Sequence, residues 1–244
     1  MNHYFVASAM CEVTEELLWK PRMAWAIKHN PTANLTLRVG SGKKTYLSHR
    51  RDTTNNASMT LTYGKMMVVS KSDPDKLCQW LSSREVHDRR YYNGELNLLN
   101  VLSHTIAHEF GHFVQVILGR RYEGSVHNPE FYTILDRIHG SGEADKIRTA
   151  LHQRCMENAI DLRRITASQK GLNALSGLLP SGEKQLSMSD VRRGQELWFL
   201  SASMRSVGPV TVKEKRRTKI VVASVANPKD RWLAPPSYFS REPA

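Results

Sequence analysis

Residues 108–112 constrain this chain more than any other segment, because they read His-Glu-Phe-Gly-His, the pattern H-E-x-x-H. They lie within an apolar run, residues 101–118, whose spacing favours a helix that Gly119 is suited to end. Side chains four residues apart lie on one face of a helix, so the imidazoles of His108 and His112 can reach one metal ion. Glu109 is then placed to contact a water molecule on that metal. The sequence therefore predicts a metal-binding helix, which we expect to begin near Gly94.

Zinc hydrolases place this pattern on a helix and complete the site with a third protein ligand and a water molecule. The best candidate for the third ligand is His127, which is followed by Asn128 and Pro129. Asparagine is a favourable helix cap and proline a favourable first helical residue, so His127 should lie where a loop enters a second helix, residues 129–138. A carboxylate in place of His127 is the alternative, and the candidates for it are Glu123, Glu143 and Glu157.

His104 precedes His108 by four residues and extends the histidine stripe of the predicted helix. Successive helical turns rise about 5.4 Å, so one tetrahedral ion cannot bind His104, His108 and His112 together. We therefore expect His104 to be a packed residue or one that supports a ligand. His139 follows the second predicted helix, where the helix dipole alone favours a histidine.

The arrangement of these motifs resembles that of the SprT-like zinc metallopeptidases, the family that contains the Spartan proteases of DNA–protein crosslinks. The resemblance covers residues 95–138 and rests on H-E-x-x-H followed by residues 127–131, His-Asn-Pro-Glu-Phe. The family commonly has a similar His-Gly-Pro-x-Phe segment, so Asn128 replaces a glycine. The resemblance implies a zincin-like fold, zinc bound by His108, His112 and His127, and Glu109 as the general base. The Cys-rich zinc ribbon that is frequent in the family is missing from this sequence.

The ligand set predicts a zinc-dependent metalloendopeptidase that acts on a protein substrate. Three neutral imidazoles leave zinc its full charge, which lowers the pKa of bound water towards about 7, and Glu109 can take the proton as the water attacks a peptide carbonyl. We expect the substrate to lie along an edge strand within residues 58–69, and Tyr122 and Tyr132 are candidates for stabilising the oxyanion. A nucleic-acid-binding adaptor or an assembly subunit with structural zinc is the alternative. The intact Glu109 favours the peptidase, because structural zinc needs no base.

The net charge of +12 is concentrated near the end of the chain. Residues 189–244 contain eleven Lys and Arg against five Asp and Glu, which is half of the excess. A basic surface attracts polyanions, so nucleic acid is a predicted partner of this segment. A solvated hairpin turn is the alternative interpretation. The centre of the charge is a cluster of five residues, Lys213, Lys215, Arg216, Arg217 and Lys219.

The cysteines and the hydropathy of the sequence favour a particular cellular compartment. Cys11, Cys78 and Cys155 are odd in number and widely spaced, which is typical of a reducing intracellular compartment, cytoplasmic or nucleoid/nuclear. The first residues do not have the pattern of a signal peptide. No apolar run approaches the ~20 residues that span a membrane, so no membrane partner is expected.

The fold class predicted from these patterns is α+β. We expect a zincin-like metallopeptidase domain with a small mixed sheet and active-site helices at residues 1–168, a linker at 169–188 and a small basic β-barrel-like domain at 189–244. The last domain resembles SH3-like or KOW-like modules, with strands at 195–200, 206–212 and 219–225 and a closing segment at 232–236. The first domain should contain a helix over 4–28 interrupted near Pro21, a hairpin of strands 35–39 and 45–49, strands 58–63 and 65–69, and a helix over 142–168.

Overall fold

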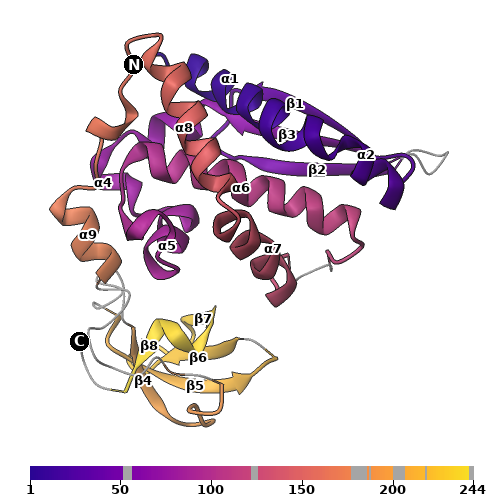
Figure 1. Ribbon diagram of the computed structural model, residues 1–244. Coiled ribbons are helices and arrows are strands. Elements are labelled where there is room, and N and C mark those ends of the chain that lie inside the picture. Colours follow the sequence, from indigo (N-terminus) through magenta and orange to yellow (C-terminus); the bar gives the residue numbers. More distant parts are fainter. Residues whose placement is uncertain are drawn as a thin grey trace. The chain divides into compact units, whose positions relative to one another are not determined.

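The computed structural model describes residues 1–51, 57–121, 126–176, 186, 188–199, 207–217 and 219–241 (Figure 1). The chain divides into two compact units, Met1–Ser168 and Gln169–Ala244. Each unit has its own sheet and at least one helix, so the α+β class predicted from the sequence is confirmed. Within the described residues, no helix is long and apolar enough to cross a membrane.

The first unit begins with the helical stretch predicted over residues 4–28. It consists of α1 (His3–Val13), a π-helical segment η1 (Thr14–Trp19) and α2 (Lys20–His29). The Asn2 side chain caps α1 by accepting a hydrogen bond from the Phe5 amide at 3.1 Å. Pro21 lies in the first turn of α2, where a helix tolerates proline, and the π-helical segment ends just before it. The chain stays helical from His3 to His29, so the interruption expected near Pro21 is a local change to π-helical hydrogen bonding rather than a break.

The sheet of the first unit has the order β1-β3-β2, with β1 (Asn34–Gly40), β2 (Tyr46–Arg51) and β3 (Ala57–Gly64). The predicted hairpin of the first two strands is wrong, because β1 runs parallel to β3 and β2 runs antiparallel to β3. The physical reason is burial: Met59, Leu61 and Tyr63 are almost completely inaccessible, so the most apolar strand takes the centre and both partners pair with it. Strand β2 is thereby left at an edge.

The strand predicted at residues 65–69 is a helix, α3 (Lys65–Lys71). A short apolar run fits either element, and the backbone contacts at Gly64 decide between them. A Cβ atom on Gly64 would lie 2.3 Å from the carbonyl oxygen of Gly42, and the Met66 amide donates to that oxygen. The chain turns there, and Met67, Val68 and Lys71 point into the unit at helical spacing.

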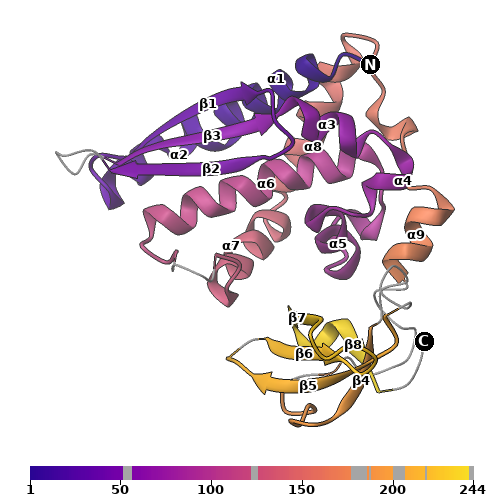
Figure 2. The same ribbon diagram turned by 180° about the vertical axis from the view of Figure 1, so that it is seen from behind.

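The predicted metal helix is α6 (Leu98–Ile117), which is buried along nearly its whole length. It begins at Leu98 rather than near Gly94, because the Asn97 side chain accepts from the Asn100 amide at 2.9 Å and caps it. It ends as expected before Gly119, whose φ is +64°. In both views the sheet lies on one side of α6, and α5 (Leu81–Asp88) and α7 (Pro129–Gly140) lie on the other (Figure 2).

The last helix predicted for the first unit is shorter than expected. The helix expected over residues 142–168 ends early: α8 (Glu143–Met156) is followed by a reversal at Ala159, with φ of +56°, and by η3 (Leu162–Arg164). The chain then returns to α6, where the Leu98 amide donates to the Ile165 carbonyl at 2.8 Å. The other short elements are α4 (Pro74–Leu77) and η2 (Tyr91–Gly94).

The second unit contains an antiparallel sheet that curls into a half-barrel, in the order β7-β6-β5-β4-β8. Its strands are β4 (Glu196–Phe199), β5 (Pro209–Lys215), β6 (Ile220–Ser224), β7 (Arg231–Ala234) and β8 (Phe239–Ser240), with η5 (Pro236–Tyr238) before the last. Alternate side chains of β5 and β6 fill the core, because Val210, Val212, Ile220 and Val222 are inaccessible. The stretch predicted as a linker begins with a helix, α9 (Gln169–Ser176), and most of the stretch beyond that helix lies outside the described residues.

Candidate metal centre

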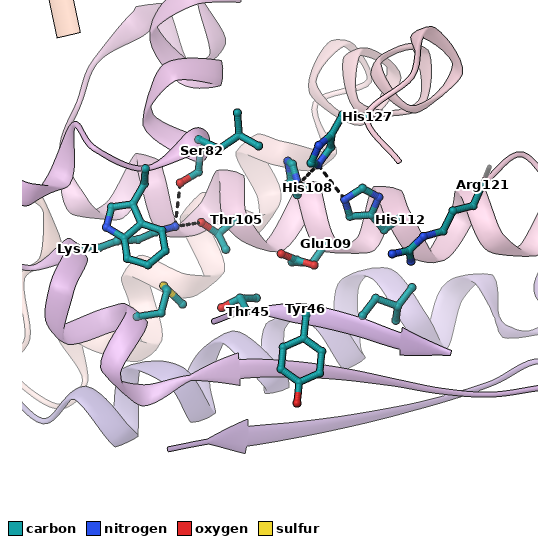
Figure 3. A pocket seen from close by; sticks show the side chains of 14 residues that line it. Thr45, Tyr46, Lys71, Ser82, Thr105, His108, Glu109, His112, Arg121 and His127 are labelled. Carbon is teal, nitrogen blue, oxygen red and sulfur yellow. Dashed lines mark hydrogen bonds between the residues drawn. The ribbon is translucent and has the colours of Figure 1, made fainter. Parts of the chain in front are cut away.

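Three imidazoles meet at the middle of α6. His108 and His112 project from one face of that helix, and His127 reaches them from the loop that enters α7 (Figure 3). The Nε2 atom of His127 lies 3.1 Å from Nε2 of His108 and 3.2 Å from Nε2 of His112. Two nitrogen ligands on one tetrahedral zinc ion are about 3.3 Å apart, as follows from Zn–N bonds of about 2.0–2.1 Å. Both separations from His127 are therefore close to the one that a single bound metal requires, and all three ligand nitrogens lie within 4.8 Å of one another.

The predicted carboxylate alternatives are not part of this group. Glu123 lies outside the described residues. Glu143 forms an ion pair with Arg22, and Glu157 accepts a hydrogen bond from Gln153 at 3.3 Å. Among the described residues, His127 is the third residue whose ligand atom lies close enough to those of His108 and His112 to share one metal ion with them.

Local contacts explain why His127 faces α6. The Asn128 side chain caps α7 by accepting from the Phe131 amide at 2.9 Å, and it also accepts from Nε2 of Gln115 at 3.1 Å. Gln115 in turn donates to the Val126 carbonyl and contacts Nδ1 of His112 at 3.3 Å. The loop is therefore tied to the same helix that carries the other two histidines. Gln115 was missed by sequence reasoning, because an apolar helix gives no sign of which polar side chain turns inward.

The Phe131 ring fills the space beneath the three histidines. It stacks on His112 with ring centres 4.3 Å apart, and it lies against Gly111. A Cβ atom at Gly111 would lie 3.2 Å from Cε2 of Phe131, which is a tight contact. The glycine within H-E-x-x-H thus allows α7 to pack closely against α6.

Glu85 on α5 supports His108, a candidate metal ligand, and sequence reasoning missed it. Its Oε2 atom accepts from Nδ1 of His108 and from Nε2 of His104, both at 2.8 Å. Burial alone would raise the pKa of Glu85, but the hydrogen bonds from His104 and His108 outweigh it and hold the pKa well below its ordinary value. An ionised Glu85 fixes the proton on Nδ1 of His108 and leaves Nε2 free for a metal, which is the usual carboxylate–histidine support of zinc sites.

Glu85, His104 and His108 are themselves close enough to be considered as a second metal group. Their separations of 2.8 Å are those of hydrogen bonds and are shorter than the distance of about 3.3 Å between two ligands of one tetrahedral ion. His104 is completely buried and reaches Nε2 of His139 with its other nitrogen at 3.0 Å. This arrangement agrees with the prediction that His104 supports a ligand.

His139 does more than interact with the end of α7. Its ring stacks on Tyr91 with centres 3.6 Å apart, and burial followed by the neighbouring His104 lowers its pKa to about 3. A neutral His139 continues the buried chain of polar groups that starts at His108. The helix dipole alone is therefore an incomplete explanation of this residue.

The electrostatics of the three-histidine group suit a metal. Burial and the neighbouring His108 lower the pKa of His112 to about 3. Partial burial and the same neighbour lower the pKa of the more exposed His127. Both rings are neutral at neutral pH, and a metal binds the unprotonated nitrogen. Burial raises the pKa of Glu109 above its ordinary value, although His108, Lys71 and Arg121 oppose the shift. A carboxylate with a raised pKa is a better general base.

A cavity of about 280 Å³ opens beside the histidines and contains Glu109. Its wall on the sheet side is the edge strand β2 and the residue before it, Thr45, Tyr46 and Leu47 (Figure 3). The prediction that residues 58–69 supply an edge strand is therefore wrong, since β3 is central and residues 65–71 are helical. The rest of the lining comes from Met67, Lys71, Trp80, Leu81, Ser82, Thr105 and Arg121 together with the three histidines.

The predicted oxyanion candidates are not found in this lining. Tyr122 lies outside the described residues. Tyr132 does not line the cavity, and its ring packs against the Arg89 guanidinium at 4.0 Å. The cationic side chains of the lining are Lys71 and Arg121, and neither was selected from the sequence.

The basic cluster of the second unit lies on the hairpin of β5 and β6, as predicted. The Arg216 amide donates to the Lys219 carbonyl at 2.8 Å and closes the turn. Lys215 has a structural role, because its ammonium donates to the carbonyls of Met188 and Val191 at 2.6 and 2.7 Å. Arg216 pairs with Glu214 at 3.0 Å. The other cluster members, Lys213, Arg217 and Lys219, are exposed.

No family model, curated protein or solved structure matches this chain. Its function is therefore inferred from the chemistry and geometry of the centre itself.

Proposed function

We propose that this protein is a zinc-dependent metalloendopeptidase. The observation that carries the proposal is the meeting of three imidazoles beside the buried carboxylate of Glu109 in one cavity, with Nε2 of His127 lying 3.1 and 3.2 Å from Nε2 of His108 and His112. Imidazole is a preferred ligand of zinc, and three protein ligands leave the fourth tetrahedral position for water. A structural zinc site is closed by four protein ligands, so the three-histidine set favours catalysis over the alternative of an adaptor or assembly subunit.

The residues of the chain have distinct roles in the proposed reaction. His108, His112 and His127 would hold the zinc ion, which would supply a water of lowered pKa and a positive charge for the peptide carbonyl oxygen. Glu109 lines the same cavity and would accept the proton of the attacking water and return it to the leaving amine. Strand β2 lies at the edge of its sheet and borders the cavity, and an extended peptide can pair with an edge strand through its main chain.

The motifs further support a place for the first unit among zincin-like peptidases of the SprT-like kind. The third ligand precedes a helix capped by Asn128, and Phe131 packs under the ligands, which gives a structural role to the segment that resembles the family's pattern. The proposed substrates are proteins, including proteins associated with nucleic acid.

The test of the proposed function is a cleavage assay with an unfolded protein substrate, with and without DNA or RNA. We expect the zinc-loaded protein to cleave, the chelated protein to be inactive, and added zinc to restore cleavage. Protein that holds one zinc ion and cleaves nothing under any of these conditions would support the adaptor alternative instead.

We propose that the second unit contacts nucleic acid through the exposed cations of its basic hairpin. Replacement of Lys213, Arg217 and Lys219 by glutamine should weaken the binding of nucleic acid. The loss of affinity should depend little on the base sequence. The replacement should also flatten the plot of log K against log salt by up to about 0.9 for each phosphate group that these cations no longer neutralise. Lys215 is left intact, because it holds two carbonyl groups of its own unit.

The salt dependence is measured by fluorescence anisotropy with labelled DNA and RNA. The matched control replaces three exposed lysines of the first unit, Lys20, Lys28 and Lys146, and removes the same charge. Equal losses of affinity in both triple variants would mean that the hairpin is an ordinary solvated turn.

A further inference from the structure

Lys71 is a buried lysine in the wall of the cavity, and the proposed reaction gives it no role. It is the last residue of α3 and only 2% exposed. Its ammonium donates to Oγ of Ser82 at 2.8 Å and to Oγ1 of Thr105 at 2.6 Å (Figure 3). Both acceptors are neutral hydroxyl groups. Lysine is rarely buried without a paired acid, and among the described residues no carboxylate lies within ion-pair distance of this ammonium.

The hydrogen-bond arrangement leaves donors that can face a ligand. The Thr105 hydroxyl donates to the Val101 carbonyl at 2.7 Å, so its hydrogen is already used. The Ser82 hydroxyl accepts from Lys71, and its own hydrogen has no acceptor among the described side chains and carbonyls. An ammonium has three N–H groups, of which two are directed at Ser82 and Thr105. One N–H of Lys71 and the O–H of Ser82 are therefore adjacent donors at the cavity wall.

The surroundings make an anion the natural complement of these donors. Burial lowers the pKa of Lys71 to about 7, although the carboxylates of Glu109 and Glu85 oppose the shift. The Trp80 ring, 5.1 Å from Nζ, offsets part of the cost of burying the charge. A bound anion would restore the missing counter-charge. Two adjacent donors match the two oxygens of a carboxylate, and Met67, Trp80 and Leu81 in the same lining suit the methylene groups that carry one.

We propose that Lys71 and Ser82 form a substrate subsite that binds a carboxylate of the peptide beside the bond to be cleaved. The inference rests on the proposed peptidase function, since the subsite shares its cavity with Glu109 and the three histidines. A peptide offers a carboxylate in two places, an acidic side chain and the free C-terminus. An enzyme that uses the first cleaves next to Glu or Asp, and one that uses the second removes residues from the end of the chain.

Cleavage of matched peptides tests the subsite. Glutamate is placed at each position around the cleaved bond and compared with glutamine, and each peptide is made with a free and an amidated C-terminus. We expect one of the two neutral replacements to lower kcat/KM roughly ten- to a hundredfold. This is the fold-change that corresponds to losing one hydrogen bond to a charged group. Loss on Glu→Gln replacement assigns the side-chain carboxylate, and loss on amidation assigns the C-terminus. Equal cleavage of all pairs would overturn the subsite.

Variants identify the residues responsible. Lys71→Met keeps the volume of the side chain and should remove the preference for the carboxylate, and Ser82→Ala should reduce it. Lys65→Met is the matched control, because Lys65 is exposed on the same helix and is not in the cavity lining. The control should keep the preference of the wild type. A preference that persists in Lys71→Met would overturn the assignment to Lys71.

A binding measurement separates the subsite from the peptidase activity. Zinc-loaded Glu109→Gln protein is titrated by calorimetry with N-acetyl-glutamyl hydroxamate, N-acetyl-glutaminyl hydroxamate, and the monohydroxamates of succinate and succinamide. We expect one carboxylate probe to bind roughly tenfold or more tightly than its amide partner. If each carboxylate probe binds as tightly as its amide partner, the subsite is overturned. Binding of the hydroxamates would still support an open position on the zinc. Absence of binding by all four would show that no open zinc position exists, and both proposals would fail.

Discussion

Replacement of Glu109 by glutamine should abolish peptide hydrolysis and leave the metal centre intact. The amide has the size of the carboxylate but cannot take a proton from water, and general-base catalysis contributes about 10²–10⁴-fold to such reactions. Glu109 lines the cavity and is not part of the three-histidine group, so its loss removes no metal ligand. The measurement is kcat/KM on a protein substrate together with zinc content and the melting temperature of the same samples.

The control for this variant is Glu95→Gln, because Glu95 is an exposed residue outside the cavity. It should keep both zinc and activity. If Glu109→Gln cleaves as fast as the wild type, another group is the base. If it loses zinc, Glu109 is a ligand or a structural partner, and the proposed division between ligands and base is wrong.

Replacement of His127 by alanine should strongly lower the affinity for zinc. Only replacement of His108 or His112 should lower it more. Folded zinc sites bind with roughly 10–16 kcal/mol shared among their ligands, so one ligand contributes about 3 kcal/mol, or about a hundred- to a thousandfold in affinity. His127 is exposed on a loop, so the variant should fold normally. Competition with a chromophoric chelator measures the affinity.

Two further variants give reference values for the loss of zinc affinity expected in His127→Ala. Glu85→Gln removes the charge that orients His108 but removes no ligand, and such changes cost about 10–100-fold in affinity. His29→Ala removes an exposed histidine of α2 and should have no effect. Unchanged affinity in His127→Ala would point to a carboxylate ligand instead, and Glu123 would be the first to examine.

Much of the local structure around the centre follows from short-range patterns in the sequence. The apolar spacing of residues 98–117 specifies a helix, and H-E-x-x-H places two imidazoles on one of its faces. Asn128 and Pro129 mark the start of the next helix, because capping and proline preferences act within one turn. His127 could therefore be selected as a partner before its position was known. Strands β4, β5 and β6 of the second unit were likewise recognisable from alternation and turn residues, whereas the two-residue strand β8 was not predicted.

Other parts of the centre were decided by tertiary structure alone. Glu85 lies 23 residues before His108, and nothing in its polar surroundings marks it as the acid that turns inward. Lys71 sits in a short apolar segment that fits a strand as well as a helix, and the backbone contact of Gly64 with Gly42 settles the choice. The edge position of β2 depends on which strand is buried on both sides. Periodicity and capping act over a few residues, whereas these features depend on contacts between segments that are distant in the chain, so they are fixed only when the elements pack.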